Sequence, residues 1–146
     1  MLYWRDVDPG NWRTKLSVRE EQRSHVADRV TLLARAYAYR EERSRACILM
    51  DDETPVGMAL YHDWDEGGVY VLSQFFIDDR YQGKGYGRKG ALLLLDEMRR
   101  DGRYSQVSLC YIDGEDNVRP FWEKVGFVRW PEDDDDTDEL GMRLTL

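Results

Sequence analysis

The stretch QFFIDDRYQGKGYGRKG, residues 74–90, joins an apolar run to a glycine-rich loop, and an amphipathic pattern over residues 88–100 predicts a helix directly after it. The first N–H groups of a helix have no partners, and its dipole is positive at that end. The glycines carry no Cβ atoms that would keep phosphate oxygens from the backbone, and Lys84 and Arg88 add positive charge. The stretch therefore predicts a phosphate-binding site between a strand and a helix.

Two known phosphate-binding motifs resemble this loop. Gly85, Gly87 and Gly90 spell the dinucleotide fingerprint G-x-G-x-x-G, and Asp113 ends the next predicted strand, where a ribose-binding acid is expected. A dinucleotide fold needs several parallel strands, however, and the segments before the loop are typical of antiparallel hairpins. A P-loop is excluded because Gly90, and not Ser or Thr, follows Lys89. The phosphate expected here belongs to another kind of ligand.

The rest of the chain predicts an α+β fold. Apolar and β-rich runs predict strands at residues 2–7, 46–50, 55–64, 68–78, 106–112 and 139–146. Amphipathic patterns predict two helices within residues 12–43, one over 88–100 and a short one over 115–127 that ends at Gly126. The turn sequences DDET and DEGG make the three central strands an antiparallel meander.

Length and charge limit the classes of protein that this chain can belong to. At 146 residues and 42% hydrophobic composition we expect a single domain spanning residues 1–146. A formal net charge of −8 argues against binding to nucleic acid and favours cationic partners. The N-terminus has no apolar signal core and no run approaches a membrane span, so we expect no membrane association and a cytoplasmic location.

The cysteines and histidines give no metal-binding pattern. Cys47 and Cys110 lie inside apolar runs, which predicts buried free thiols in a reducing compartment. His25 and His62 are the only histidines, and neither has the spacing from a cysteine that a zinc site needs. No metal is expected.

Two motifs at characteristic spacing resemble a known family. Gln82-Gly83-Lys84-Gly85-Tyr86-Gly87 fits Q/R-x-x-G-x-G/A, the central motif of the GCN5-related N-acetyltransferase (GNAT) family, and FWEKVGF at residues 121–127 resembles the family's second landmark. Residues 16–37 and 72–87 are similar to the bacterial spermine/spermidine (diamine) acetyltransferase branch. The resemblance implies a splayed, mostly antiparallel sheet of about six to seven strands flanked by helices.

The resemblance also implies a cosubstrate, acetyl-CoA, and the residues that bind it. Its pyrophosphate would lie on the amides of Gln82, Gly83, Lys84, Gly85, Tyr86, Gly87 and Arg88. The main chain of Phe75, Phe76 and Ile77 would pair with the pantetheine arm, and we expect Asn117 and Trp122 to contact it as well. Family members are often dimers, so a homodimer is possible by analogy.

Acetyl transfer to an amine makes chemical demands of its own. The nitrogen must be neutral, so a carboxylate or water has to take its proton, and the developing oxyanion needs an N–H donor, for which we expect a strand bulge near Ile77. Most relatives have a tyrosine where this chain has Trp122, and an indole has no proton to give to the leaving thiolate. Three explanations stay open: the thiolate leaves unaided, which we favour, Tyr111 or Tyr86 substitutes, or the enzyme is slow.

The acceptor is expected to be a primary amine, with polyamines first; a peptide or protein amino group, or a non-catalytic acyl-CoA binding domain, are the alternatives. Glu20 and Glu21 on an early helix and Gln74 on the central strand are the candidate substrate-binding residues. The run at residues 131–139 is interpreted as a solvated acidic loop, or alternatively as a device that concentrates cations.

The remaining polar and aromatic residues are interpreted as structural. Asp78 and Asp79 are expected to be solvated acids at a strand end, and the cluster His62, Asp63 and Asp65 a satisfied hairpin. Four tryptophans are expected to be packing residues: Trp4, Trp12, Trp64 and Trp130.

Overall fold

A computed structural model of the chain describes residues 1–23, 28–112 and 118–146. Within these ranges one sheet has the strand order β1-β2-β3-β4-β5-β7-β6. Its strands are β1 (Leu2–Asp6), β2 (Arg45–Asp51), β3 (Thr54–Trp64), β4 (Val69–Ile77), β5 (Gln106–Ile112), β6 (Val128–Arg129) and β7 (Glu139–Thr145). The helices are α1 (Arg29–Ala38), α2 (Tyr86–Asp101) and α3 (Val118–Val125). The α+β class is confirmed; β6 was missed because two residues carry no pattern.

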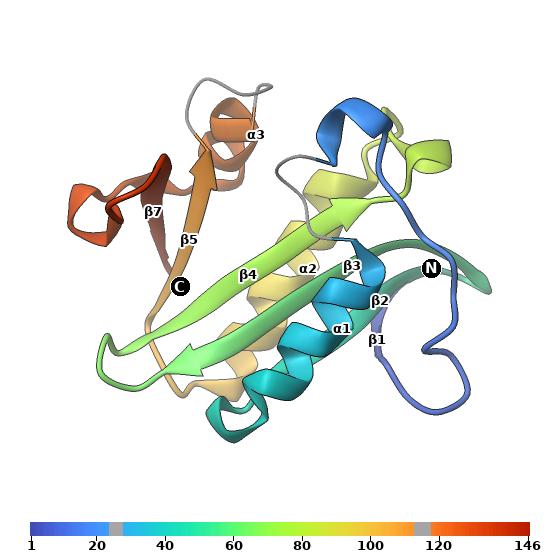
Figure 1. Cartoon of the computed structure of the whole chain (residues 1–146), viewed down its shortest axis with the longest axis horizontal. Helices are drawn as coiled ribbons and strands as arrows, with labels where there is room; N and C mark the ends of the chain where they lie inside the picture. The colour runs from blue at the N-terminus through green and yellow to red at the C-terminus, as the bar shows by residue number, and fades with distance from the viewer. Residues whose placement is uncertain (24–27, 113–117) are drawn as a thin grey trace.

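The sheet is splayed in its centre. Strands β2 to β4 form the predicted antiparallel meander, β1 adds to it antiparallel to β2, and β5, β7 and β6 pair antiparallel on the other side. Between the two groups, β4 and β5 run parallel and pair only at Tyr70 with Val107 and Val71 with Ser108. Beyond these pairs the two strands diverge (Figure 1). The carboxyl half of β4 therefore has an open edge.

Helices cover both faces of the sheet. Figure 1 shows α1 in front of the central strands and α2 behind them. Leu32 of α1 packs with Ile48 and Leu60, whereas Met98 of α2 lies in the cluster that holds Tyr70. Because successive side chains of a strand point to opposite faces, burial on both sides explains the nearly continuous apolar runs of β2 to β4.

The prediction of a helix from Trp12 onward is wrong. Leu16 and Val18 are buried and alternate with exposed residues, which is the period of an extended chain. The Ser17 N–H donates to Asp78 Oδ2 over 2.9 Å, and the Asp79 N–H donates to Ser17 O over 2.8 Å. These bonds to the end of β4 hold the segment extended as far as a short 3-10 turn, η1 (Glu20–Gln22).

Two predictions of exposure are wrong: Asp78, expected to be solvated, is buried, and Cys110, expected to be buried, is exposed. Asp78 is 2% exposed instead of solvated; burial disfavours its charge, but hydrogen bonds from Arg80 and Ser17 hold the pKa of Asp78 below its ordinary value. The carboxylate caps the turn that leads into the glycine loop. Cys47 is buried as predicted, whereas Cys110 is exposed on the face of β5 that α2 does not cover.

Of the tryptophans, Trp4 is buried, but Trp12 and Trp64 are 44% and 43% exposed and do not belong to the core. Trp130 is half-buried, with the Arg143 guanidinium 5.2 Å from the centre of its ring. Sequence alone does not separate these cases, because an aromatic residue near a turn has no periodic neighbours that fix its side.

The acidic loop is only partly solvated. Asp133 is largely buried and accepts two hydrogen bonds from Arg143, at 2.7 and 2.9 Å, and Ser108 donates a third. Arg129 pairs with Asp134 and keeps the pKa of that carboxyl below its ordinary value. Asp133 and Asp134 are therefore structural.

The hairpin between β3 and β4 is satisfied as predicted. Asp63 is 2% exposed and accepts hydrogen bonds from Arg43 Nε at 2.6 Å and from Arg103 at 2.9 and 3.0 Å.

Among the described residues, no helix is long and apolar enough to cross a membrane.

Candidate active site

A cavity of about 700 Å³ lies at the carboxyl end of β4, between the glycine loop and α3. It collects most of the residues that the sequence proposed: Glu21, Phe75, Phe76, Ile77, Gln82, Gly83, Gly85, Tyr86, Gly87, Arg88 and Trp122. Four proposed residues do not line it, namely Glu20, Gln74, Lys84 and Tyr111. Asn117 and Asp113 lie outside the described residues.

The cavity has lining residues that sequence reasoning missed: Val18, Arg19, Gln22, Tyr81, Val118, Phe121 and Lys124. Phe121 and Lys124 belong to the FWEKVGF landmark, so their motif was noticed but not their role. Val18, Arg19 and Gln22 come from the segment wrongly predicted as a helix, and no local signal places that segment beside β4.

The glycine loop has the geometry of an anion site. Gly83 and Gly85 have φ angles of 77° and 86°, and a Cβ at either would meet no protein atom within 4 Å. Gly85 is the N-cap of α2 and provides no side-chain cap, so the N–H groups of the first turn are left for a ligand. The cationic side chains of Arg88 and Lys124 line the same cavity. The residues present fit a phosphate-bearing group.

Gln82 fixes the loop to its surroundings. Its side-chain Nε2 donates to Ile77 O and to Gln22 Oε1, each over 2.9 Å. The Arg19 Nε contacts Asp79 Oδ1 at 3.0 Å, next to the same turn. These bonds join the N-terminal segment, the end of β4 and the loop into one wall.

The open edge of β4 presents alternate backbone groups. In the register with β3, Met58 lies opposite Phe76, and the Asp78 N–H donates to Val56 O over 2.8 Å. Because antiparallel residues alternate between bonded and non-bonded pairs, Phe76 faces β3, whereas Phe75 and Ile77 direct their N–H and C=O groups to the open edge. Of the three residues proposed to pair with a ligand, two are therefore placed to do so and Phe76 is not.

The expected bulge near Ile77 is wrong. Ile77 lies opposite Gly57 in regular pairing. The irregularity is instead at Ser73, because Leu60 pairs with Gln74 and Tyr61 with Leu72. Side-chain period alone does not locate such an extra residue when both faces of a strand are buried.

Trp122 is part of an aromatic wall. Its ring centre is 5.2 Å from Phe75, 4.8 Å from Phe121 and 5.4 Å from Phe127, in edge-to-face arrangements. Tyr86 donates its hydroxyl to Asp51 Oδ2 over 2.6 Å, and this bond raises the pKa of Tyr86. Tyr111 is buried, and its hydroxyl has no hydrogen-bond partner in the described part of the chain. The hydroxyl of Tyr86 is thus bonded to Asp51, whereas the hydroxyl of Tyr111 has no such bond among the described residues.

A model of the acetyltransferase (GNAT) family matches residues 4–127. The chain belongs to the GNAT family. The splayed sheet and the loop before α2 are therefore features of a GNAT domain, as the sequence motifs predicted.

A curated protein is similar to this GNAT chain over part of its length. The spermine/spermidine N(1)-acetyltransferase of Bacillus subtilis is 31% identical over 78 residues, which are 49% of this chain and 51% of that protein. The match thus spans about half the length of this curated relative.

Solved structures share the fold over almost the whole chain. A spermidine N-acetyltransferase from Vibrio cholerae in complex with CoA and spermine has a TM-score of 0.74 at 17% identity, covering 99% of this chain and 95% of that one. An aminoglycoside acetyltransferase in complex with coenzyme A has a TM-score of 0.77 at 16% identity, with the same coverage of 99% and 95%. A ribosomal-protein alanine N-acetyltransferase from Escherichia coli has a TM-score of 0.71 at 19% identity, covering 99% and 94%. At these identities the likeness concerns the fold.

Proposed function

We propose that the chain transfers the acetyl group of acetyl-CoA to the primary amine of a small molecule. The observation that carries this proposal is the single cavity that joins the N-terminus of α2 to the open edge of β4. One end suits phosphates and the other suits an extended amide-bearing chain, which are the two parts of coenzyme A. Membership of the GNAT family supports the same conclusion.

Each part of the cavity has a task in this reaction. The first-turn N–H groups of α2, with Arg88 and Lys124, bind the pyrophosphate. The edge groups of Phe75 and Ile77 pair with the pantetheine arm, and one of the two N–H groups faces the oxyanion as it develops. The thioester supplies an activated acetyl group, and holding that group beside the amine converts a bimolecular reaction into an effectively unimolecular one.

Proton transfer is the least specialised part of the site. Glu21 lines the cavity and can take the amine proton through water. The indole of Trp122 packs against Phe75, so it shapes the arm-binding wall and donates no proton to the thiolate. The thiolate therefore leaves without a tyrosine at that position; the hydroxyl of Tyr111 has no hydrogen-bond partner among the described residues, but Tyr111 does not line the cavity.

Polyamines are the first acceptors to test, because of the acidic net charge and the named activity of the curated relative. A peptide amino group is the second candidate, and a non-catalytic CoA-binding domain the third. A role of the acidic loop in attracting cations falls to Asp135 and the exposed acids after it, since Asp133 and Asp134 are engaged in ion pairs.

The test is to incubate the protein with acetyl-CoA and separate amines, and to follow free CoA thiol and acetylated product. The panel is spermine, spermidine, putrescine, amino acids and a peptide. Turnover with a small amine supports the proposal. Turnover with the peptide alone, or tight CoA binding without any turnover, would overturn it in favour of the second or third candidate.

A further inference from the structure

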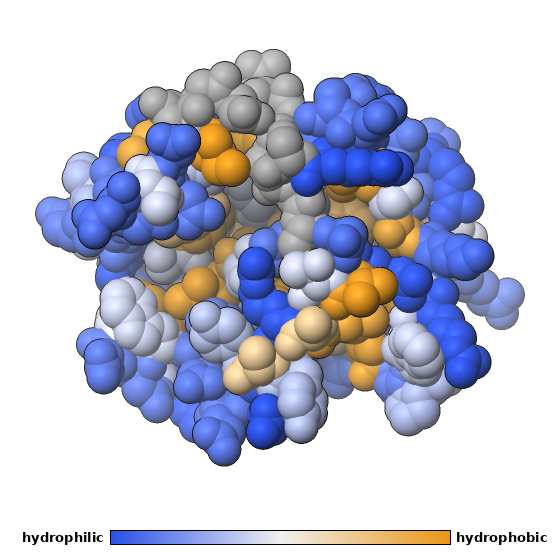
Figure 2. Space-filling view, in the orientation of Figure 1, coloured by the Kyte–Doolittle hydropathy of each residue, from blue (hydrophilic) through white to orange (hydrophobic). Residues whose placement is uncertain are grey.

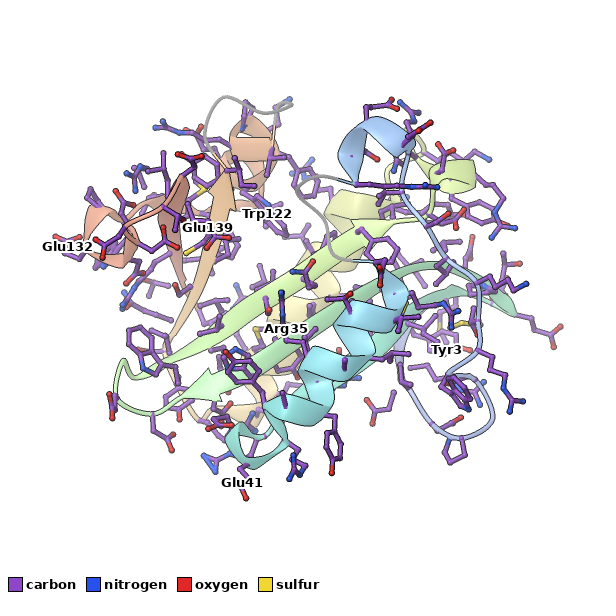
Figure 3. All side chains as sticks on the ribbon, in the orientation of Figure 1. Tyr3, Arg35, Glu41, Trp122, Glu132 and Glu139 are labelled. Carbon is purple, nitrogen blue, oxygen red and sulfur yellow. The ribbon has the colours of Figure 1, made fainter. Side chains whose placement is uncertain are left out.

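The splay has a second side, away from the glycine loop. On the face that carries α1, Arg35 of α1 and Glu139 of β7 extend toward each other across the gap between β4 and β5 (Figure 3). The surface is hollowed between these two parts of the molecule (Figure 2). Neither residue lines the cavity assigned to coenzyme A.

Arg35 is a half-buried cation without a strong internal partner. Its nearest hydrogen-bond contact is Ser73 Oγ at 3.5 Å, at the β4 bulge, and within the described residues no carboxylate oxygen lies within 4 Å of it. A partly buried guanidinium normally gains a carboxylate or several hydrogen bonds, because its five donors otherwise lose water without replacement. The geometry leaves the N–H groups of the Arg35 guanidinium available to a bound anion.

Glu139 supplies the opposite charge on the facing wall. It begins β7, where it pairs with Ile112 of β5, so its side chain lies on the same face of the sheet as Cys110. Burial and a hydrogen bond shared with Asp135 raise the pKa of Glu139, and the charge of Arg35 opposes that shift. The two charges therefore act on each other across the gap without forming a contact ion pair.

A pure polycation fits this face poorly. Its ammonium groups would meet Arg35 directly beside β4 and would leave the guanidinium still unpaired. A molecule with one anionic and one cationic group matches both walls. The planar fork of arginine is suited to the two oxygens of a carboxylate.

From this arrangement we infer that the face between α1 and β7 binds an acceptor that carries a carboxylate as well as an amine, with Arg35 holding the carboxylate and Glu139 facing a cationic group. The inference rests on the proposed function and narrows its substrate class to amino-acid-like amines. Arg35 and Glu139 are then specificity-determining residues, and neither takes part in the chemistry of the thioester.

Matched acceptors test the inference directly. Lysine and cadaverine have the same alkyl amine and differ by the carboxylate, and lysine methyl ester keeps the carbon skeleton with the charge removed. We expect kcat/KM for lysine to exceed that for both other amines by about tenfold or more, the worth of one charge-assisted bidentate contact. Equal values for lysine and cadaverine would overturn the inference while leaving the proposed function intact; no acetylation of any amine would refute the proposed function.

Variants separate specificity from folding. Arg35→Gln should abolish the preference for lysine over cadaverine, Arg35→Lys should keep part of it, and Arg100→Gln on the exposed end of α2 should change nothing. Glu139→Gln should raise KM, whereas Glu132→Gln in the same loop should not. A thermal melt of each variant checks that it folds. An unchanged preference in folded Arg35→Gln would contradict the assignment.

Discussion

Replacing Gly85 by alanine tests the phosphate site. Gly85 has φ 86°, so a side chain there is strained by about 1 kcal/mol, which lowers Tm by about 3 °C in a domain of this size. The added Cβ meets no protein atom within 4 Å, so nothing inside the protein adds to that cost. It projects instead into the space beside the free N–H groups of α2. We expect the Kd for coenzyme A to rise about tenfold or more, as contacts to phosphate are lost.

Gly102→Ala is the matched control for this experiment. Gly102 has φ 69° at the opposite end of the same helix, and the nearest atom to its Cβ would be Arg99 O at 3.8 Å. Both variants should lose similar stability in a thermal melt, while calorimetric titration should show weaker coenzyme A binding for Gly85→Ala alone. Equal Kd values in the two variants would refute the reasoning.

Three further changes probe the fold and the chemistry. Asp63→Asn should lower the free energy of unfolding, measured in urea, by about 3 kcal/mol, because Arg43 and Arg103 lose a buried partner. Asp65→Asn at an exposed position is the control and should be nearly neutral; similar losses in both variants would be inconsistent with a buried network. Burial raises the pKa of Cys47 to about 12, so this thiol stays protonated at pH 8 and should react slowly with iodoacetamide until urea unfolds the protein; fast labelling of Cys47 in the native protein argues against this. Trp122→Tyr should leave kcat unchanged if the thiolate leaves unaided, and a large increase would show that a missing proton donor limits the rate.

Local signals explain what could be predicted from the sequence. The glycine loop, α2 and the hairpins between β2, β3 and β4 are specified by residues next to one another, through turn chemistry and hydrophobic period. The extended segment around Ser17 was missed because its bond to Asp78 joins residues 61 positions apart. The sequence of this segment, taken alone, fits a helix about as well as it fits an extended chain.

The candidate site divides in the same way. Motifs located the phosphate loop and the aromatic wall around Trp122, because each lies within a continuous stretch. Other features depend on how separate strands and helices are arranged, and the sequence of a single segment does not predict them. These are the bulge at Ser73 and the facing charges of Arg35 and Glu139.

The most direct test of the coenzyme A site is an amide NMR titration of the protein with coenzyme A. The N–H groups of Phe75 and Ile77 face the open edge of β4, so their signals should shift strongly, together with those of the first turn of α2. The N–H groups of Gln74 and Phe76 face β3 and should shift less. Shifts confined to other parts of the molecule, or shifts of equal size along all of β4, would contradict the placement of coenzyme A in the splay.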